Sequence, residues 1–195
     1  MKKNKLFILT GTSAVGKTSV ALGVLKKSSA KGGSASGEKN IQRSLTFTSR
    51  PQRKGEKNGV DYHFIALKNF KNKIKKGEFL EWADNYGHYY GTNKEEIGKI
   101  LKSGKNALVV IDIKGALNIK KKWPQSVTIF ILPESVSQLK KRFQKRADTS
   151  PKDIAKRLKI AHWELAQASK CDYWVVNREN RLNEAIIAVL AIVNE

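Results

Sequence analysis

The chain has 195 residues, of which 40% are hydrophobic and 28% charged, so it suits one globular domain with a sizeable core. Its 38 Lys and Arg residues against 17 Asp and Glu residues give a net charge of +21, which creates a field that attracts polyanions. However, 30 of these cations are scattered lysines, which are typical of a solvated surface. The single cysteine, Cys171, excludes an intrachain disulfide, and no apolar run approaches the roughly 20 residues of a membrane span.

The first part of the chain alternates strand-like and helix-like segments. Leu6–Thr10 is expected to form a buried strand. This apolar stretch is too short for a signal peptide and is followed directly by a glycine motif, so we expect a cytoplasmic protein. Residues 17–27 are expected to form a helix, and the Gly/Ser-rich residues 28–40 a surface loop. Short strand pieces are expected around Phe47, Tyr62 and Phe64–Ile65.

The middle of the chain continues this alternation. A helix is expected at residues 68–76, and residues 107–113 and 127–132 are apolar runs typical of buried strands. Ser135 and Gln138 have the spacing of a capping box, which predicts a helix that runs to about Arg146.

The last part of the chain predicts two further helices and a strand. Ser150-Pro151 begins one helix, whose apolar face carries Ile154, Leu158, Ala161 and Leu165. Tyr173–Val176 is expected to be a strand, and a final helix places four residues in register: Leu182, Ile186, Val189 and Val193. Strands that alternate with helices predict an α/β fold with a parallel sheet.

Residues 11–18 match the phosphate-binding pattern G-x-x-x-x-G-K-[ST] between an expected strand and helix. The glycines let backbone N–H groups face phosphate oxygens, and the start of the helix adds the positive end of its dipole. Lys17 can reach the β- and γ-phosphates, and Thr18 can coordinate Mg²⁺. The predicted ATP site therefore comprises Gly11, Thr12, Ser13, Ala14, Val15, Gly16, Lys17 and Thr18.

The segment from Thr46 to Tyr62 resembles the guanylate kinases, which carry the signature Thr-Thr-Arg-x-x-Arg-x-Gly-Glu-x-x-Gly-x-x-Tyr. The resemblance covers nearly the whole chain apart from the 28–40 loop, and it continues through Gly77–Ala83, Tyr89–Thr92, Asp112–Gly115, Ile131–Pro133 and Val176–Asn177.

The resemblance implies a three-layer P-loop NTPase fold with a central parallel sheet, a small mixed β subdomain that binds GMP, and a helical lid. It implies one domain over residues 1–195, with a core at about 1–43, 93–133 and 166–195, a GMP-binding region at about 44–92 and a lid at about 134–165. The implied activity is the ATP-dependent, Mg²⁺-assisted phosphorylation of GMP to GDP in purine nucleotide metabolism.

The resemblance also implies which residues hold the GMP phosphate. These are Arg50 and Arg53, with the hydroxyls of Tyr62 and Tyr90. Two guanidinium groups and two phenols match a phosphate dianion in charge and geometry. Without the surrounding motif, the tyrosines could also be packed core aromatics.

For the guanine base, the resemblance implies Glu81 and Asp112 as readers and Thr46 and Thr92 as hydroxyl donors. Guanine offers its N1–H and 2-amino groups to carboxylates, whereas adenine presents a bare acceptor at N1. A buried mismatch of this kind costs about 1–3 kcal/mol for each group. We therefore expect the pocket to reject adenine.

Three further arginines resemble the lid and catalytic arginines of the family, namely Arg142, Arg146 and Arg157. Phosphoryl transfer needs positioning and charge neutralisation, which arginines supply. With Lys17 they form the predicted catalytic group, and Asn177 is expected near the adenine of ATP. Each arginine taken singly could also be part of a solvated helix face.

One position departs from the family pattern. The family strand usually reads Asp-x-Asp, whereas this chain has Val110 before Ile111 and Asp112. In the family the first carboxylate lies near the Mg²⁺ water shell, so we expect an active enzyme with a raised Mg²⁺ requirement.

Three other functions stay open at this stage. The chain could be a guanylate-kinase-like module that binds phosphorylated peptides, or a kinase for another phosphorylated acceptor. A nucleic-acid-binding role rests on the charge of +21 alone and is not expected as the primary function. The expected partners are ATP and GMP, with no membrane, and the chain is expected to be a monomer or homodimer.

Overall fold

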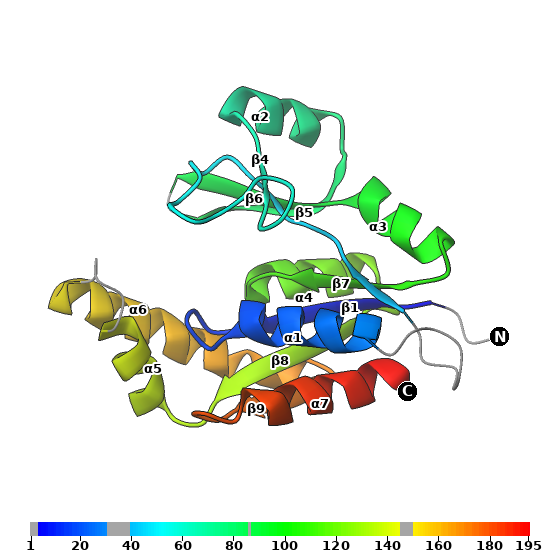
Figure 1. Ribbon diagram of the computed structural model, residues 1–195. Coiled ribbons are helices and arrows are strands. Elements are labelled where there is room, and N and C mark those ends of the chain that lie inside the picture. The colour runs from blue at the N-terminus through cyan, green and yellow to red at the C-terminus, as the bar shows by residue number, and fades with distance from the viewer. Residues whose placement is uncertain (1–3, 31–39, 86, 145–149) are drawn as a thin grey trace.

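The computed structural model describes residues 4–30, 40–85, 87–144 and 150–195. Within these ranges the strands form two separate sheets, with helices packed against both (Figure 1). No described helix is both long enough and apolar enough to cross a membrane.

The larger sheet has five parallel strands in the order β2-β7-β1-β8-β9. Their bounds are β1 Leu6–Gly11, β2 Ile41–Arg43, β7 Asn106–Val110, β8 Val127–Pro133 and β9 Tyr173–Asn177. Every residue of the central strand β1 is buried, as expected for a parallel strand covered on both faces. The loop at the carboxyl end of β1 is the segment with the phosphate-binding pattern.

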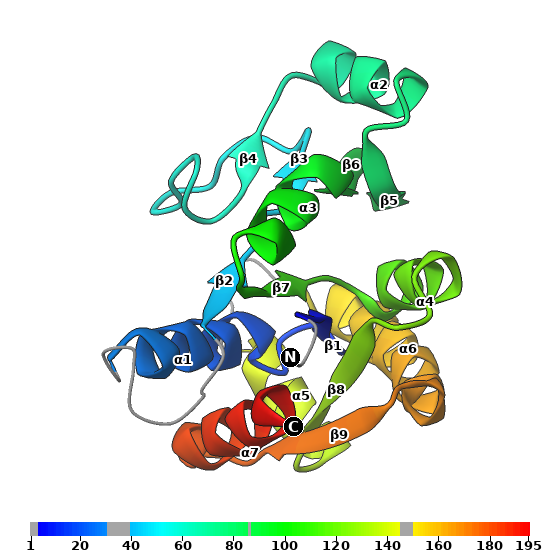
Figure 2. The ribbon, with the colours of Figure 1, turned by 90° about the vertical axis from the view of Figure 1, so that its right-hand side faces the viewer.

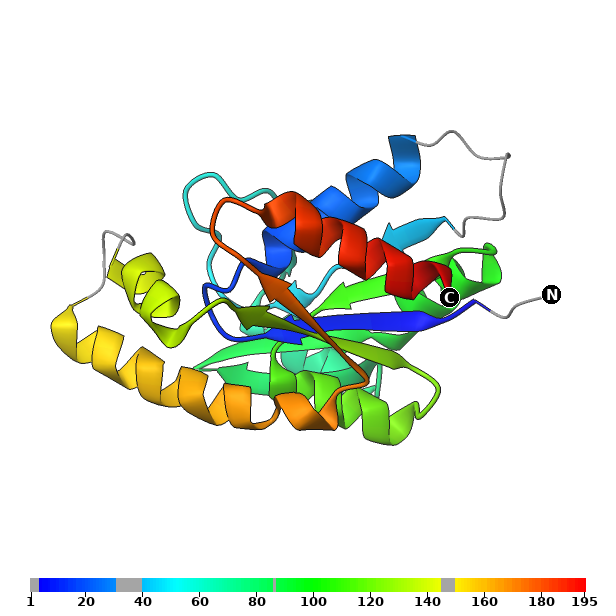
Figure 3. The same ribbon diagram turned by 90° about the horizontal axis from the view of Figure 1, so that it is seen from below.

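Two hydrophobic clusters form the core on the two faces of this sheet, because successive side chains of a strand point to opposite sides. Phe7 and Leu9 belong to the first cluster, and Leu6 and Ile8 to the second. Helices α1 (Lys17–Ala30) and α7 (Leu182–Asn194) lie on one side of the sheet, and α4 (Ile113–Lys122) and α6 (Pro151–Ala166) on the other (Figure 3).

The smaller sheet is mixed, with the order β4-β3-β6-β5, and lies apart from the core sheet (Figure 2). Its strands are β3 Phe47–Thr48, β4 His63–Phe64, β5 Phe79–Asn85 and β6 His88–Asn93.

Two helices flank the smaller sheet. Helix α2 (Leu67–Lys75) packs Phe70 against Phe79, with their ring centroids 4.6 Å apart. A side chain at Gly91 would lie 3.0 Å from both rings, which explains the glycine there. Helix α3 (Lys94–Lys102) leads from this sheet to β7 in the core.

The remaining helices follow β8. Helix α5 spans Val136–Gln144, and the Ser135 hydroxyl accepts the N–H of Gln138 as the capping box predicts. Ser150 caps α6 in the same way through the N–H of Asp153, and a short 3₁₀ helix at Ala168–Lys170 precedes β9.

The predicted helices and most predicted strands exist, although Tyr62 forms only an isolated bridge with Asn58 and the predicted end of α5 at about Arg146 lies outside the described residues. Two bounds are corrected. The predicted strand 107–113 ends at Val110, because the Asp112 side chain accepts the N–H of Gly115 and caps α4. Helix α1 extends to Ala30, so residues 28–30 are not part of the predicted loop, whose residues 31–39 lie outside the described ranges.

A third correction concerns one side chain. Of the four residues predicted in register on the last helix, Leu182 at the first position of α7 is 37% exposed, whereas Ile186, Val189 and Val193 are buried.

Candidate functional site

The loop between β1 and α1 forms a compact cradle of backbone. Gly11 and Gly16 adopt φ of +141° and +98°, values that L side chains rarely adopt. The Lys17 ammonium donates to the carbonyl oxygens of Gly11 and Thr12 at 2.8 and 2.9 Å. These two hydrogen bonds hold the Lys17 ammonium against the loop. The next residue, Thr18, lies exposed in the first turn of α1.

Two predicted residues from distant elements hold this loop. Asn177, at the end of β9, donates to the carbonyl oxygen of Val15 at 2.7 Å. The Arg142 guanidinium of α5 donates to the carbonyls of Ala14 and Val15 at 3.2 and 2.8 Å. The structure thus brings a predicted lid arginine into direct contact with the loop.

A third contact with the loop comes from a residue that the sequence did not single out. The backbone N–H of Ser13 donates to the Glu164 carboxylate of α6 at 3.4 Å. Glu164 is buried, and this burial raises the pKa of its carboxyl group, while the nearby Lys17 opposes the rise. Helices α5 and α6 therefore both reach the phosphate-binding loop.

Of the other two predicted catalytic arginines, the structure describes one, Arg157. Arg157 is half-buried on α6, where its guanidinium lies 5.8 Å from the centroid of the Phe143 ring on α5. Arg146 lies outside the described residues.

The smaller sheet gathers the predicted phosphate-binding group around Arg50. Its guanidinium donates to the Tyr90 hydroxyl at 3.2 Å and to Glu56 at 2.8 Å, and lies 5.6 Å from the centroid of the Tyr62 ring. Burial alone would lower the pKa of Arg50, but hydrogen bonds to Glu56 and Tyr90 raise it overall. Arg53 is exposed beside this group, and its backbone N–H donates to the second Glu56 oxygen at 2.8 Å.

The two predicted base-reading carboxylates meet at the start of α4. Glu81 of β5 is buried, and its Oε1 accepts the Thr92 hydroxyl at 2.7 Å. Asp112 accepts the Gly115 N–H at 2.8 Å, and a side chain at Gly115 would lie 3.0 Å from Oε2 of Glu81. Glu81 and Asp112 therefore both lie close to Gly115. Burial, reinforced by the charge of Asp112, raises the pKa of Glu81 to about 7.

The phosphate-binding and base-reading groups share one face of the smaller sheet. Tyr90 and Thr92 are two residues apart on β6, so their side chains leave the same side. Glu81 is the cross-strand partner of Thr92. The buried Thr46 precedes β3, and continuing the register of β3 with β6 places it opposite Thr92.

Two contributing residues lay outside the prediction, for different reasons. Glu56 lies inside the signature segment, three residues after Arg53. This spacing could have indicated that its carboxylate contacts Arg50 and Arg53. Glu164 meets Ser13 across 151 positions of sequence, and only the packing of α6 reveals that contact.

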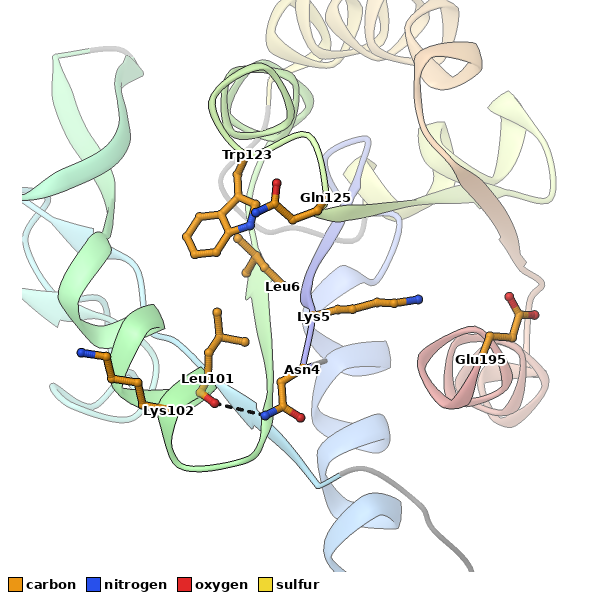
Figure 4. A pocket seen from close by; sticks show the side chains of 8 residues that line it. All are labelled: Asn4, Lys5, Leu6, Leu101, Lys102, Trp123, Gln125 and Glu195. Carbon is orange, nitrogen blue, oxygen red and sulfur yellow. Dashed lines mark hydrogen bonds between the residues drawn. The ribbon is translucent and has the colours of Figure 1, made fainter. Parts of the chain in front are cut away.

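A separate cavity of about 530 Å³ lies at the amino end of β1, where Asn4 donates to the Leu101 carbonyl oxygen at 3.1 Å (Figure 4). None of the predicted site residues lines it. Its lining residues are Asn4, Lys5, Leu6, Leu101, Lys102, Trp123, Gln125 and Glu195. Within the described ranges, no group of three or more His, Cys, Asp or Glu side chains is arranged to hold a metal ion.

Comparisons with known proteins point in one direction. Residues 3–195 match the family model described as guanylate kinase. A guanylate kinase of Thermus thermophilus is 39% identical over 190 residues, which cover 97% of this chain and 80% of the relative. A guanylate kinase of Thermotoga maritima is 39% identical over 191 residues, covering 98% and 86%. The crystal structure of guanylate kinase from Anaplasma phagocytophilum superposes with a TM-score of 0.75 at 26% identity, covering 99% of this chain and 86% of that one.

Proposed function

The chain belongs to the guanylate kinase family and catalyses the ATP-dependent phosphorylation of GMP to GDP, and on this premise we propose which of its side chains carry the reaction. The loop at residues 11–18 binds ATP, and the polar face of the smaller sheet binds GMP. The observation that carries this assignment is the meeting of two acidic side chains, Glu81 and Asp112, at the backbone of Gly115.

In the proposed acceptor site, Glu81 and Asp112 accept the guanine N1–H and 2-amino groups. The Thr92 hydroxyl already donates to one Glu81 oxygen, so it orients the carboxylate for the base. Thr46 supplies a second hydroxyl on the same row of the sheet. Adenine at this position would leave both carboxylates facing a lone pair, which costs about 1–3 kcal/mol for each unsatisfied group.

The GMP phosphate is proposed to bind Arg50, with the hydroxyls of Tyr62 and Tyr90 and the side chain of Arg53. Arg50 already rests on Tyr90 and is paired with Glu56, so its guanidinium is held in place before the phosphate arrives. Such preorganisation reduces the entropy that binding must overcome.

Transfer begins when an oxygen of the GMP phosphate attacks the γ-phosphorus of ATP. The bond from the γ-phosphorus to the β,γ-bridging oxygen breaks, its electron pair stays on that oxygen, and ADP leaves. Lys17 and the arginines at 142, 146 and 157 are proposed to stabilise the negative charge of the transferring group. Asn177 is proposed to lie near the adenine of ATP. Closure of α5 and α6 over the loop would exclude water from this step.

The donor site suits Mg²⁺, which prefers oxygen ligands and keeps several of its waters. The Thr18 hydroxyl is exposed in the first turn of α1 and would be a direct ligand, and the Glu164 carboxylate lies beside the same loop. When bound, the ion would neutralise charge on the β- and γ-phosphates.

The valine at position 110 gives a test of the metal requirement. Val110 ends β7 beside Leu9, two residues before the phosphate-binding loop. Val110→Asp would place a carboxylate there, so we expect the Mg²⁺ concentration at half-maximal rate to fall at least about threefold. Mg²⁺ titration of both proteins at fixed ATP and GMP measures this change. Superimposable curves would mean that the valine has no influence.

The raised pKa of Glu81 predicts how GMP binding depends on pH. The base donates to an ionised carboxylate, and the ionised fraction of a group with a pKa of about 7 shrinks as the pH falls below that value. The KM for GMP should therefore rise about tenfold from pH 8 to pH 6. The phosphate of GMP also titrates near pH 6, so Glu81→Gln is the control. If the variant shows the same tenfold rise, Glu81 is not its source.

The acceptor preference is tested by ADP release with GMP, AMP, CMP and UMP. We expect turnover with GMP to exceed that with the other three by at least about a hundredfold, because only guanine satisfies both carboxylates. Comparable rates with another acceptor would favour the alternative of a different kinase, and ATP turnover no faster with GMP than without it would favour a binding module.

Other expectations remain proposals. The proposed division of the chain has a core, a GMP-binding region at about 44–92 and a lid at about 134–165. The monomer or homodimer state and the cytoplasmic location likewise stay predictions.

A further inference from the structure

A buried carboxylate lies against the phosphate-binding loop. Glu164 is 8% exposed, and it accepts the Ser13 N–H from helix α6, which passes beside the loop between β1 and α1 (Figure 1). Lys17 and Lys114 favour the charged form of this group, whereas Asp112 opposes it. An acidic side chain of α6 therefore lies against a loop whose backbone N–H groups, Lys17 and helix start attract anions.

This arrangement disfavours the binding of a nucleotide that carries no metal ion. A carboxylate removed from water is destabilised by a neighbouring phosphate unless a cation lies between them. Lys17 is one such cation, but its ammonium already donates to Gly11 and Thr12. ATP that carries a divalent metal brings the second cation with it.

The same loop has an unsatisfied polar group. The Thr12 hydroxyl is fully buried and makes no hydrogen bond to any described residue. Buried hydroxyls without a partner are uncommon, and a phosphate oxygen or an ordered water would satisfy this one.

We propose that Glu164 makes the donor site selective for metal-bound ATP. Its carboxylate attracts the hydrated Mg²⁺ that accompanies the phosphates and repels ATP that lacks the metal. Glu164 is a positioning residue in this role, because it acts through the metal and Lys17 and not on the transferred phosphoryl group. The inference rests on the proposed ATP site and adds to it the form of nucleotide that the site accepts.

The test compares two dissociation constants in the absence of GMP, so that no turnover intervenes. Titration calorimetry measures the Kd for ATP with excess Mg²⁺ and with a chelator, in the wild type and in Glu164→Gln. The glutamine keeps an oxygen for the Ser13 N–H but removes the charge. Glu95→Gln, on the exposed surface of α3, removes the same charge elsewhere and is the matched control.

We expect metal-bound ATP to bind Glu164→Gln more weakly and metal-free ATP to bind it more tightly. The preference for the metal-bound form should fall at least about tenfold, and Glu95→Gln should keep the wild-type preference. An unchanged preference, or an equal change in both constants, would overturn the proposal and leave Glu164 as a structural tie. Should Glu164→Gln unfold, Glu164→Asp, which keeps the charge, must retain the preference. Failure of the wild type to bind ATP in either form would instead refute the proposed donor site.

Discussion

Replacing Lys17 with methionine should lower kcat by about 10³-fold or more. The Lys17 ammonium is held by two carbonyls of the loop, so its charge is already in place when ATP arrives. A fixed cation next to the transferring phosphoryl group acts where negative charge develops, and losing one such group typically costs about 10²–10³ or more in rate. Methionine keeps most of the length of the side chain and removes the charge together with the two hydrogen bonds to the loop. Steady-state ADP release with GMP measures the effect.

The control for this prediction is Lys26→Met, on an exposed position of the same helix. It should retain the wild-type rate, and GMP binding should be unchanged in both variants. A Lys17→Met protein that keeps more than about a tenth of the wild-type kcat would remove Lys17 from the catalytic group.

Glu81→Gln should reduce kcat/KM for GMP by about 10²–10³-fold while changing that for AMP little. The glutamine oxygen can still accept the Thr92 hydroxyl. Its amide group then faces the guanine N1–H, so two donors oppose each other in a buried pocket. This mismatched pair of donors, at about 1–3 kcal/mol, and the lost hydrogen bond to a charged acceptor, at about 1.5–3 kcal/mol, account for the expected loss.

Glu78→Gln separates this effect from a general change of charge. Glu78 stands just before the same strand, but its carboxylate pairs with Lys73 on α2, outside the pocket. It should leave the ratio of GMP to AMP turnover unchanged. An equal loss with both nucleotides in Glu81→Gln would mean that the residue supports the fold and does not read the base.

The phosphate-binding loop was predictable because its parts are consecutive. Every contributing group between Gly11 and Thr18 lies within eight residues, and the strand and helix on either side have clear apolar patterns. The same holds for Ser150, whose helix cap is formed with Asp153, three residues later. Local chemistry of this kind can be read directly from a sequence.

Asp112 illustrates what a pattern of apolar residues cannot resolve. Ile111 and Ile113 are both buried, so the apolar run continues across the end of β7 and into α4. The strand ends because the Asp112 carboxylate accepts the Gly115 N–H, a contact that competes with further strand pairing. The helix at Ile113–Lys122 was consequently missed.

The hairpin of β5 and β6 and the helix α3 were missed for another reason. Aromatic, charged and glycine residues are mixed over residues 79–93. The two strands are held in place by packing on Phe70 of α2. The family resemblance marked Glu81 and Tyr90 in this segment, but the alternation of its two faces became clear only in the folded sheet.

The most direct test of the account is a crystal structure with GMP bound. We expect the guanine edge within hydrogen-bonding distance of Glu81 and Asp112, and the phosphate against Arg50 and the hydroxyls of Tyr62 and Tyr90. A guanine that turns its N1–H and 2-amino groups away from both carboxylates, or a phosphate held away from Arg50, would contradict it.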